Sequence, residues 1–203
     1  MRLADWLRPR LLDRLMAQLD DLRPEIAGRA EGEVLELGFG TGRNLPHLPP
    51  RVKRLAAIDP KPGDGLPALE DRVACAPFPV ERHALRADGE LPFDAGRFDT
   101  VLTTFTLCSI PDPLRALREV RRVLAPGGRL LFLEHGRAPD PRTARWQDRL
   151  NPLWLRLTGE CNMNRPIDRL VEAGGFRLEE LTRFRHRGPA VLAHMYRGVA
   201  HSA

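Results

Sequence analysis

The stretch VLELGFGTGRN, residues 34–44, indicates the fold class of this chain. Its apolar residues Val34, Leu35 and Leu37 predict a buried strand, and three glycines then follow at alternate positions. Glycine lets the backbone turn sharply and lets a ligand come close to the main chain. A strand, a glycine loop and then a helix are typical of nucleotide-cofactor sites. The loop reads G-x-G-x-G, which differs from the G-x-G-x-x-G of dinucleotide-binding folds.

Length and composition predict one globular domain. The chain has 203 residues, of which 42% are hydrophobic and 29% charged. No apolar stretch approaches the roughly 18–20 residues that span a bilayer. The first residues, MRLADWLRPRLLDRL, are too interrupted by charge for a secretory signal. Three cysteines without metal-ligand spacing predict reduced thiols, no metal site and a cytoplasmic protein.

The net charge of +5 comes almost entirely from arginine, since Lys53 and Lys61 are the only lysines. A basic balance is one mark of nucleic-acid binding. Here the arginines are spread over the whole chain, and no basic run is interleaved with aromatic residues. We interpret the excess as compositional bias and expect no nucleic-acid partner.

Strands and helices alternate along the middle of the chain. Asp112 and Pro113 are expected to begin a helix that APGG ends at residues 125–128, and RPIDRLVEAGGF predicts another. This order implies a doubly wound α/β fold: a Rossmann-like, seven-stranded, mostly parallel sheet with helices on both faces. The strands are expected at 34–37, 54–60, 81–89, 98–107, 129–136, 176–184 and 190–200.

The two ends of this core are less regular. Apolar residues at helical spacing predict a helix over 10–22, which either packs on the core or forms a lid or a basic surface that touches membranes weakly. Residues 137–165 break the alternation. We therefore expect a single domain with an N-terminal helix region (1–30), a core (31–136), a cap-like insertion (137–165) and a C-terminal helix and strands (166–200).

Polar residues stand at or just past successive strand ends. They are Glu36, Asp59, Asp88, Thr104 and His135. In open parallel sheets the ligand lies at the carboxyl ends of the strands, so these residues are expected to converge on one site. Aspartate also ends strands because it favours turns, but a series of three acids is less easily explained in that way.

Several segments together resemble the class I S-adenosylmethionine (SAM) dependent methyltransferases, particularly those of ubiquinone and menaquinone biosynthesis. They are ELGFGTG, AIDP, ADGELPF, RFDTVLTTFTLCSIPDP and REVRRVLAPGGRLLFLEH. The later segments EHGRAP, WQDRLNPLW, GECNMNR and HMYRGVA resemble the methyltransferase-like 7 proteins, which are thiol S-methyltransferases. The likeness covers residues from about 30 to 200. Those relatives have an apolar N-terminal membrane anchor, whereas this chain begins with charged residues, so membrane residence is not carried over.

The resemblance implies SAM as the cofactor. Asp59 is placed for the ribose hydroxyls, because a carboxylate accepts two hydrogen bonds. Asp88 with Gly89 is placed for the adenine, and Asn44 either caps a following helix or contacts the ligand. The full set of expected cofactor residues is Glu36, Gly38, Gly40, Gly42, Asn44, Asp59, Pro60, Asp88, Gly89 and Thr104.

For the acceptor, the resemblance implies a small, partly apolar molecule, with a thiol first and a quinone-precursor carbon or an oxygen second. A non-catalytic SAM-binding protein is a further alternative, and the glycine spacing disfavours a nicotinamide oxidoreductase. His135 is the candidate base for a thiol, and a purely structural role for it is equally open. The candidate acceptor contacts are Cys108, Trp146, Trp154, Cys161 and Asn162. For the cysteines and tryptophans, core packing is the alternative.

Overall fold

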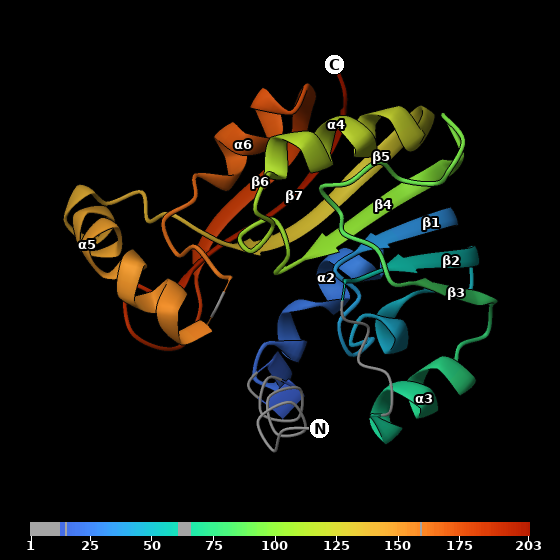
Figure 1. The fold of residues 1–203 in the computed structure, drawn as a ribbon, viewed down its shortest axis with the longest axis horizontal. Coiled ribbons are helices and arrows are strands. Elements are labelled where there is room, and N and C mark those ends of the chain that lie inside the picture. The colour runs from blue at the N-terminus through green and yellow to red at the C-terminus, as the bar shows by residue number, and fades with distance from the viewer. Residues whose placement is uncertain (1–12, 15, 61–65, 159) are drawn as a thin grey trace.

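A computed structural model describes residues 13–14, 16–60, 66–158 and 160–203. Its centre is one seven-stranded sheet in the order β3-β2-β1-β4-β5-β7-β6 (Figure 1). Strands β1 to β5 are parallel, and β7 lies antiparallel between β5 and β6. This confirms the predicted Rossmann-like sheet. The strands are β1 Gly32–Leu37, β2 Val52–Ile58, β3 Val80–His83, β4 Phe98–Thr104, β5 Leu124–His135, β6 Phe176–Arg185 and β7 His194–Ser202.

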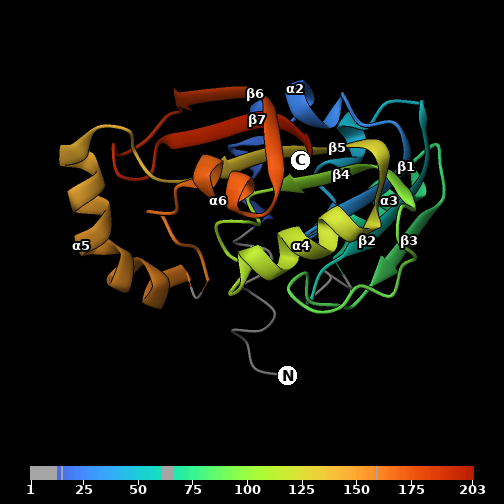
Figure 2. The same cartoon turned by 90° about the horizontal axis from the view of Figure 1, so that it is seen from above.

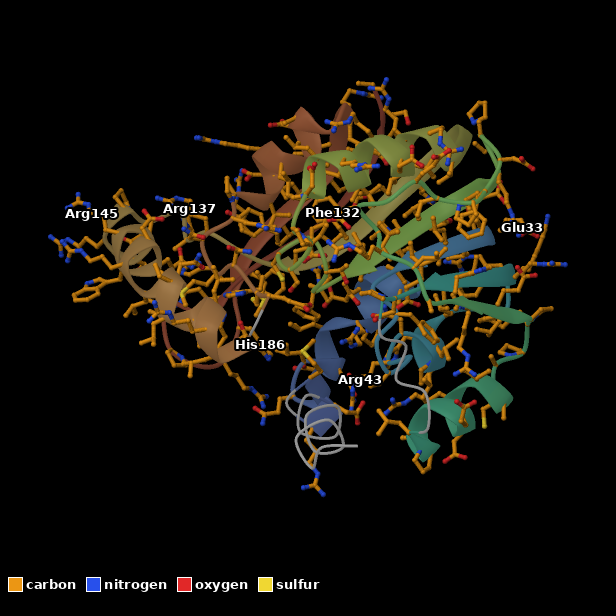
Figure 3. All side chains as sticks on the ribbon, in the orientation of Figure 1. Glu33, Arg43, Phe132, Arg137, Arg145 and His186 are labelled. Carbon is orange, nitrogen blue, oxygen red and sulfur yellow. The ribbon has the colours of Figure 1, made fainter. Side chains whose placement is uncertain are left out.

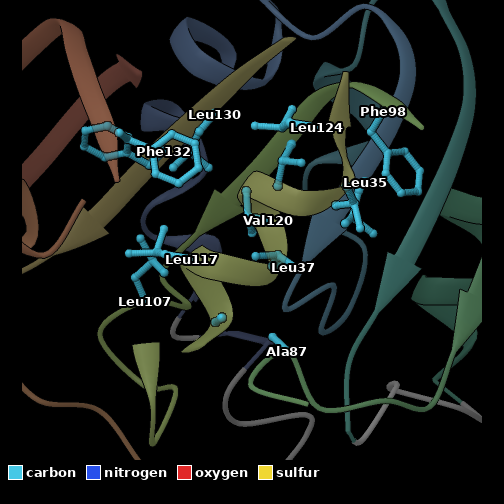
Figure 4. Close-up of a cluster of buried hydrophobic side chains, with 14 of the residues drawn as sticks. Leu35, Leu37, Ala87, Phe98, Leu107, Leu117, Val120, Leu124, Leu130 and Phe132 are labelled. Carbon is cyan, nitrogen blue, oxygen red and sulfur yellow. The ribbon is translucent and has the colours of Figure 1, made fainter. Parts of the chain in front are cut away.

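Apolar side chains pack on both faces of the sheet. Helices α4 (Pro113–Val123) and α6 (Ile167–Ala173) cover one face, where Leu117 packs in the cluster that contains Phe98 and Phe132 (Figure 4). The short α2 (Pro24–Ala27) and α3 (Pro67–Ala74) cover the other face. As predicted, the Asp112 side chain caps α4 by accepting a hydrogen bond from the Arg115 amide at 2.9 Å.

The helix expected after the glycine loop is absent. A single 3₁₀ turn, η2 (Leu45–His47), takes its place. The prolines of LPHLPP explain the difference, because Pro49 and Pro50 donate no backbone hydrogen bond and disfavour helix in the residue before them. Strand β3 is also shorter than predicted and ends at His83, so Asp88 lies five residues beyond it.

The segment 137–165 contains a helix that the sequence pattern did not predict. Helix α5 (Pro141–Thr158) lies beyond the carboxyl ends of the central strands in both views (Figures 1 and 2). Asp140 caps it by accepting hydrogen bonds from the amides of Arg142 and Thr143 at 3.1 and 2.8 Å. Pro152 stands inside the helix and hides its periodicity.

The predicted helix over 10–22 falls partly on residues 1–12 and 15, which lie outside the described part of the chain. Residues 13, 14, 16 and 17 are helical, and the 3₁₀ turn η1 (Asp20–Leu22) follows. Among the described residues, no helix combines the length and apolar character needed to cross a bilayer.

Candidate active site

The glycine loop after β1 leaves part of its main chain facing open space. Gly38, Gly40 and Gly42 have φ angles of 73°, 55° and 70°. A Cβ on Gly38 would lie 2.1 Å from Thr106 Oγ1, whereas a Cβ on Gly40 would meet no protein atom within 4 Å. The Gly40 amide donates a hydrogen bond to Asp59 Oδ2 at 2.9 Å. The predicted loop and the predicted ribose acid therefore lie together, and Asp59 holds the loop in place.

A buried polar network lies beneath this loop. Asn44 Nδ2 donates to Glu36 Oε1 at 2.8 Å and to Thr104 Oγ1 at 2.9 Å. Arg23 Nη1 donates to Asn44 Oδ1 at 2.8 Å and to Thr104 Oγ1 at 2.9 Å. Asn44 therefore makes no side-chain capping hydrogen bond to the η2 turn that follows it, and its side chain and that of Thr104 are engaged with protein groups. Sequence reasoning missed Arg23, because nothing in its neighbourhood distinguishes it from the many other arginines.

Glu36 supplies a buried carboxyl group to this network, and burial favours its neutral form. Its side chain is almost fully enclosed, and burial raises its pKa to about 8, against the opposing effects of the Asn44 hydrogen bond and the Arg23 charge. Its second oxygen, Oε2, makes no hydrogen bond within the described part of the chain. A buried carboxyl oxygen without a partner fits a ligand that carries a hydrogen-bond donor, as the positively charged amino group of SAM does, and that charge would favour the ionised form of Glu36.

The N-terminal segment also touches the glycine loop. Asp13 accepts hydrogen bonds from Thr41 Oγ1 at 2.5 Å and from Arg43 at 2.6 and 2.9 Å, and Arg72 lies 3.3 Å away. Figure 3 labels Arg43 beside the N-terminal segment. Burial alone would raise the Asp13 pKa, but the hydrogen bonds from Arg43 and Thr41 hold it below its ordinary value. Asp13 and Thr41 line a cavity of about 280 Å³ with Arg14 and residues 66–68.

The remaining predicted cofactor residues are not joined to this network. Asp88 lies in the loop after β3 and is paired with Arg86 at 2.9 and 3.0 Å, and these hydrogen bonds lower its pKa. The Gly89 amide donates a hydrogen bond to the carbonyl of Arg86 in the same turn, and Pro60 is exposed.

A second cavity, of about 620 Å³, is larger than the one beside Asp13 and is lined in part by Gly127 near the start of β5. This is the opposite end of the sheet from the carboxyl ends of the strands, where ligands bind in folds of this kind.

A second cluster forms at the carboxyl end of β5. His135 Nδ1 lies 3.6 Å from Cys161 Sγ, and Cys161 Sγ lies 3.9 Å from Cys108 Sγ. Asn162 joins the segments through its amide and Nδ2, which donate to the Cys108 carbonyl at 2.9 and 3.2 Å. Trp154 Nε1 is buried and has no hydrogen-bond partner among the described residues, but its interaction with Cys161 helps to lower the Cys161 pKa. Four of the five predicted acceptor contacts thus gather around His135.

The fifth, Trp146, does not join them. It is 54% exposed on the outer side of α5, where the Arg149 guanidinium stacks 5.4 Å from its ring. Trp146 and Trp154 are eight residues apart, and this spacing places them at different angles around the helix. The geometry does not support an acceptor role for Trp146.

Glu134, which sequence reasoning left out, orders the loop that carries Cys108. Its buried carboxylate accepts hydrogen bonds from Thr103 Oγ1 and the Thr106 amide at 3.0 Å and from the Cys108 amide at 3.2 Å. The same loop contains Phe105 with φ 55°, the sole non-glycine residue with positive φ in the described ranges. Strain of this kind persists where the surroundings enforce it, and here it turns the chain between the two clusters.

Comparisons with known proteins agree with this geometry. A family model described as a methyltransferase domain matches residues 8–181. The chain is 32% identical to human thiol S-methyltransferase TMT1B, covering 84% of this chain and 72% of that protein. Identity to human TMT1A is 35%, covering 70% of this chain and 59% of that protein. Identity to the demethylmenaquinone methyltransferase of Clavibacter sepedonicus is 32%, covering 61% and 49%.

The rat TMT1B protein is 32% identical and this chain spans 66% of its length, so the chain spans between 49% and 72% of the length of these four relatives. Two solved structures share the fold. The [4+2]-cyclase SpnF has a TM-score of 0.66 at 19% identity, covering 91% of this chain and 80% of that one. A SAM-dependent methyltransferase from Aquifex aeolicus has a TM-score of 0.60 at 17% identity, covering 95% and 97%. The chain belongs to the class I SAM-dependent methyltransferases, whose cofactor is S-adenosylmethionine.

Proposed function

We propose that this chain methylates a small, partly apolar thiol, with His135 as the base. The observation that supports this most directly is the position of His135 Nε2, which is buried and makes no hydrogen bond within the described residues, at the carboxyl end of β5. The identity to the TMT1 proteins favours the same acceptor class.

The hydrogen bonding of the ring assigns a role to each nitrogen. Nδ1 faces Cys161 Sγ at 3.6 Å, and hydrogen bonds from Cys108 and His135 lower the Cys161 pKa against the effect of burial. A thiolate at Cys161 accepts a hydrogen bond from the Nδ1–H group of His135. In this tautomer the lone pair of the ring is on Nε2. Nε2 then takes the proton of an acceptor thiol, because the thiolate is the nucleophile in such reactions.

SAM supplies an electrophilic methyl group on a sulfonium. The protein's part is to hold the acceptor sulfur in line with that methyl group and to exclude water. The glycine loop, Asp59 and the Glu36 network are suited to hold the cofactor. Trp154 and Asn162 lie in the same cluster as His135 and are suited to orient the acceptor.

The test is methyl transfer from labelled SAM to a panel of small thiols, phenols and quinone precursors. We expect thiols to be methylated. Transfer to quinone precursors alone would favour the carbon acceptor that the Clavibacter relative's name describes. SAM binding without transfer to any panel member would favour a non-catalytic role.

The role of His135 has a separate test. His135→Ala should lower turnover of an alkyl thiol by roughly 10²-fold at pH 7, with the loss shrinking as pH rises and the thiol ionises unaided. With an acidic aryl thiol that is already ionised at pH 7, the loss should nearly vanish. An equal loss with both thiols at every pH would assign His135 to structure.

A further inference from the structure

Two thiols face one another across segments that are far apart in the sequence. Cys108 lies in the loop after β4, and Cys161 lies between α5 and α6. Their Sγ atoms are 3.9 Å apart. The amide that follows Cys161 donates to the Cys108 carbonyl at 2.9 Å, so the two backbones are already adjacent. A disulfide needs a sulfur separation of about 2.05 Å, so the two side chains must rotate toward one another before the bond can form.

The two thiols differ in reactivity. Hydrogen bonds with Cys108 and His135 lower the pKa of Cys161. The hydrogen bond between the two thiols and burial raise the pKa of Cys108. Cys161 is also the more accessible of the two, being partly exposed where Cys108 is buried. An oxidant that reaches the site therefore meets a thiolate at Cys161, with a second thiol directly behind it.

We propose that Cys161 and Cys108 are a redox-active pair that forms an intramolecular disulfide when the protein meets a hydroperoxide. The Cys161 thiolate attacks one peroxide oxygen, which breaks the O–O bond and leaves a sulfenic acid. Cys108 then attacks that sulfur as it loses its proton, the S–S bond forms, and the oxygen departs as water. In total two thiols and one hydrogen peroxide give one disulfide and two waters.

The disulfide also changes the surroundings of His135. Cys161 is no longer a thiolate, so Nδ1 loses its acceptor, and the sulfur moves away from the ring toward Cys108. In the described part of the chain, Asp59 holds the Gly40 amide, whereas the two cysteines contact each other, Ser109 and His135. Methyl transfer should therefore stop while SAM still binds; this consequence rests on the proposed function, whereas the disulfide does not.

The three cysteines fall on separate tryptic peptides, which makes the disulfide directly readable. Cys75 lies in peptide 73–82, Cys108 in 98–115 and Cys161 in 157–169. The reduced full-length protein is treated with about two equivalents of hydrogen peroxide, alkylated and digested without reductant. We expect peptides 98–115 and 157–169 to be joined, and dithiothreitol to separate them. The exposed Cys75 should remain alkylated, with a rate of oxidation at least about tenfold lower.

Two variants separate the steps. Cys108→Ser should leave Cys161 as a sulfenic acid that dimedone traps, and Cys161→Ser should leave Cys108 reduced. Cys75→Ser is the matched control and should form the cross-link as the natural protein does. Oxidation of Cys75 ahead of Cys161, or the absence of the joined peptides, would overturn the proposal.

Activity measurements keep this proposal distinct from the proposed function. The oxidised protein should bind SAM with unchanged affinity and regain methyl transfer after dithiothreitol. Undiminished transfer by the cross-linked protein would overturn the claim that the disulfide closes the site. A reduced protein that methylates no thiol would contradict the proposed function, and the joined peptides would still report on the cysteine pair.

Discussion

At the scale of single residues, Gly40 and Gly127 form a natural comparison. Both have left-handed backbones, with φ 55° and 78°, and a Cβ on either would meet no protein atom within 4 Å. An alanine at either position should cost about 1 kcal/mol of stability through its backbone alone. Gly40→Ala should in addition weaken SAM binding at least about tenfold, because its Cβ occupies the space that the cofactor approaches.

Thermal unfolding and isothermal titration calorimetry of both variants measure these effects. Gly127→Ala reports the backbone cost by itself, since Gly127 stands at the opposite end of β5 from His135. Unchanged SAM affinity in a folded Gly40→Ala protein would show that the cofactor does not approach the main chain at Gly40.

The charge of Glu36 predicts a pH dependence of stability. Because burial raises its pKa from 4.5 to about 8, the folded protein favours the neutral acid. The contribution of neutral Glu36 to the free energy of unfolding is fully present below about pH 4.5. It is lost as pH rises through 8, at no more than about 1.4 kcal/mol per pH unit. Glu36→Gln is neutral throughout and keeps an oxygen for Asn44, so its stability should fall less between pH 5 and 9.

Urea unfolding at a series of pH values tests this. Glu33→Gln, on the same strand but partly exposed, is the matched control and should follow the natural protein. If the free energy of unfolding changes with pH in the same way for the natural protein and for Glu36→Gln, then Glu36 is already ionised in the folded state.

The residues that could be predicted from sequence are those whose signal is local. The glycine spacing and the acid at the end of β2 can be recognised within a few positions, and they lie together in the structure. Arg23 has no local signal, because its partner Thr104 lies 81 positions away and only the folded sheet brings them together. Asp88 is wrongly predicted at a strand end because the predicted strand 81–89 runs six residues past the observed end of β3.

At the scale of elements, the N-terminal segment acts on the cofactor loop through Asp13. Asp13→Ala removes the carboxylate that accepts hydrogen bonds from Thr41 and Arg43. The glycine loop then loses these two contacts with the N-terminal segment. We expect the SAM dissociation constant to rise about tenfold, or roughly 1.4 kcal/mol, mainly through faster dissociation. Stopped-flow displacement of SAM measures this rate.

Asp21→Ala is the control for this variant, since it removes an equal charge from an exposed side chain of the same segment. Unchanged SAM affinity in Asp13→Ala would show that the contacts of Asp13 with Thr41 and Arg43 do not affect cofactor binding. Tighter binding would show that the segment obstructs the cofactor.

Helix α5 shows why some elements could not be predicted. The Asp140–Pro141 pair that begins it is the same signal as Asp112–Pro113, which did predict α4. Pro152 and the surrounding polar residues hid the apolar periodicity that carried the α4 prediction. Without the helix, the sequence offered no means to separate a half-buried Trp154 from an exposed Trp146.

At the scale of the whole molecule, the sheet divides the chemistry between its strands. The proposed cofactor residues come from the ends of β1 and β2, and the thiol and imidazole groups come from the end of β5 and from loops that meet there. The loop after β4 connects them, because Thr104 belongs to the first group and Cys108 to the second. Fold and acceptor choice are therefore separable, as the shared fold of a cyclase also indicates.

That separation gives the last prediction. Trp154→Ala should raise the KM of the acceptor about tenfold and leave SAM affinity within about twofold. The reason is that Trp154 contacts Cys161 in the second cluster. Trp146→Ala removes the same side chain from the exposed side of the same helix and should change neither quantity. Steady-state kinetics with the acceptor found in the panel, together with calorimetry for SAM, measures both. Equal losses of acceptor and SAM binding in Trp154→Ala would mean that α5 covers the whole site and does not select the acceptor.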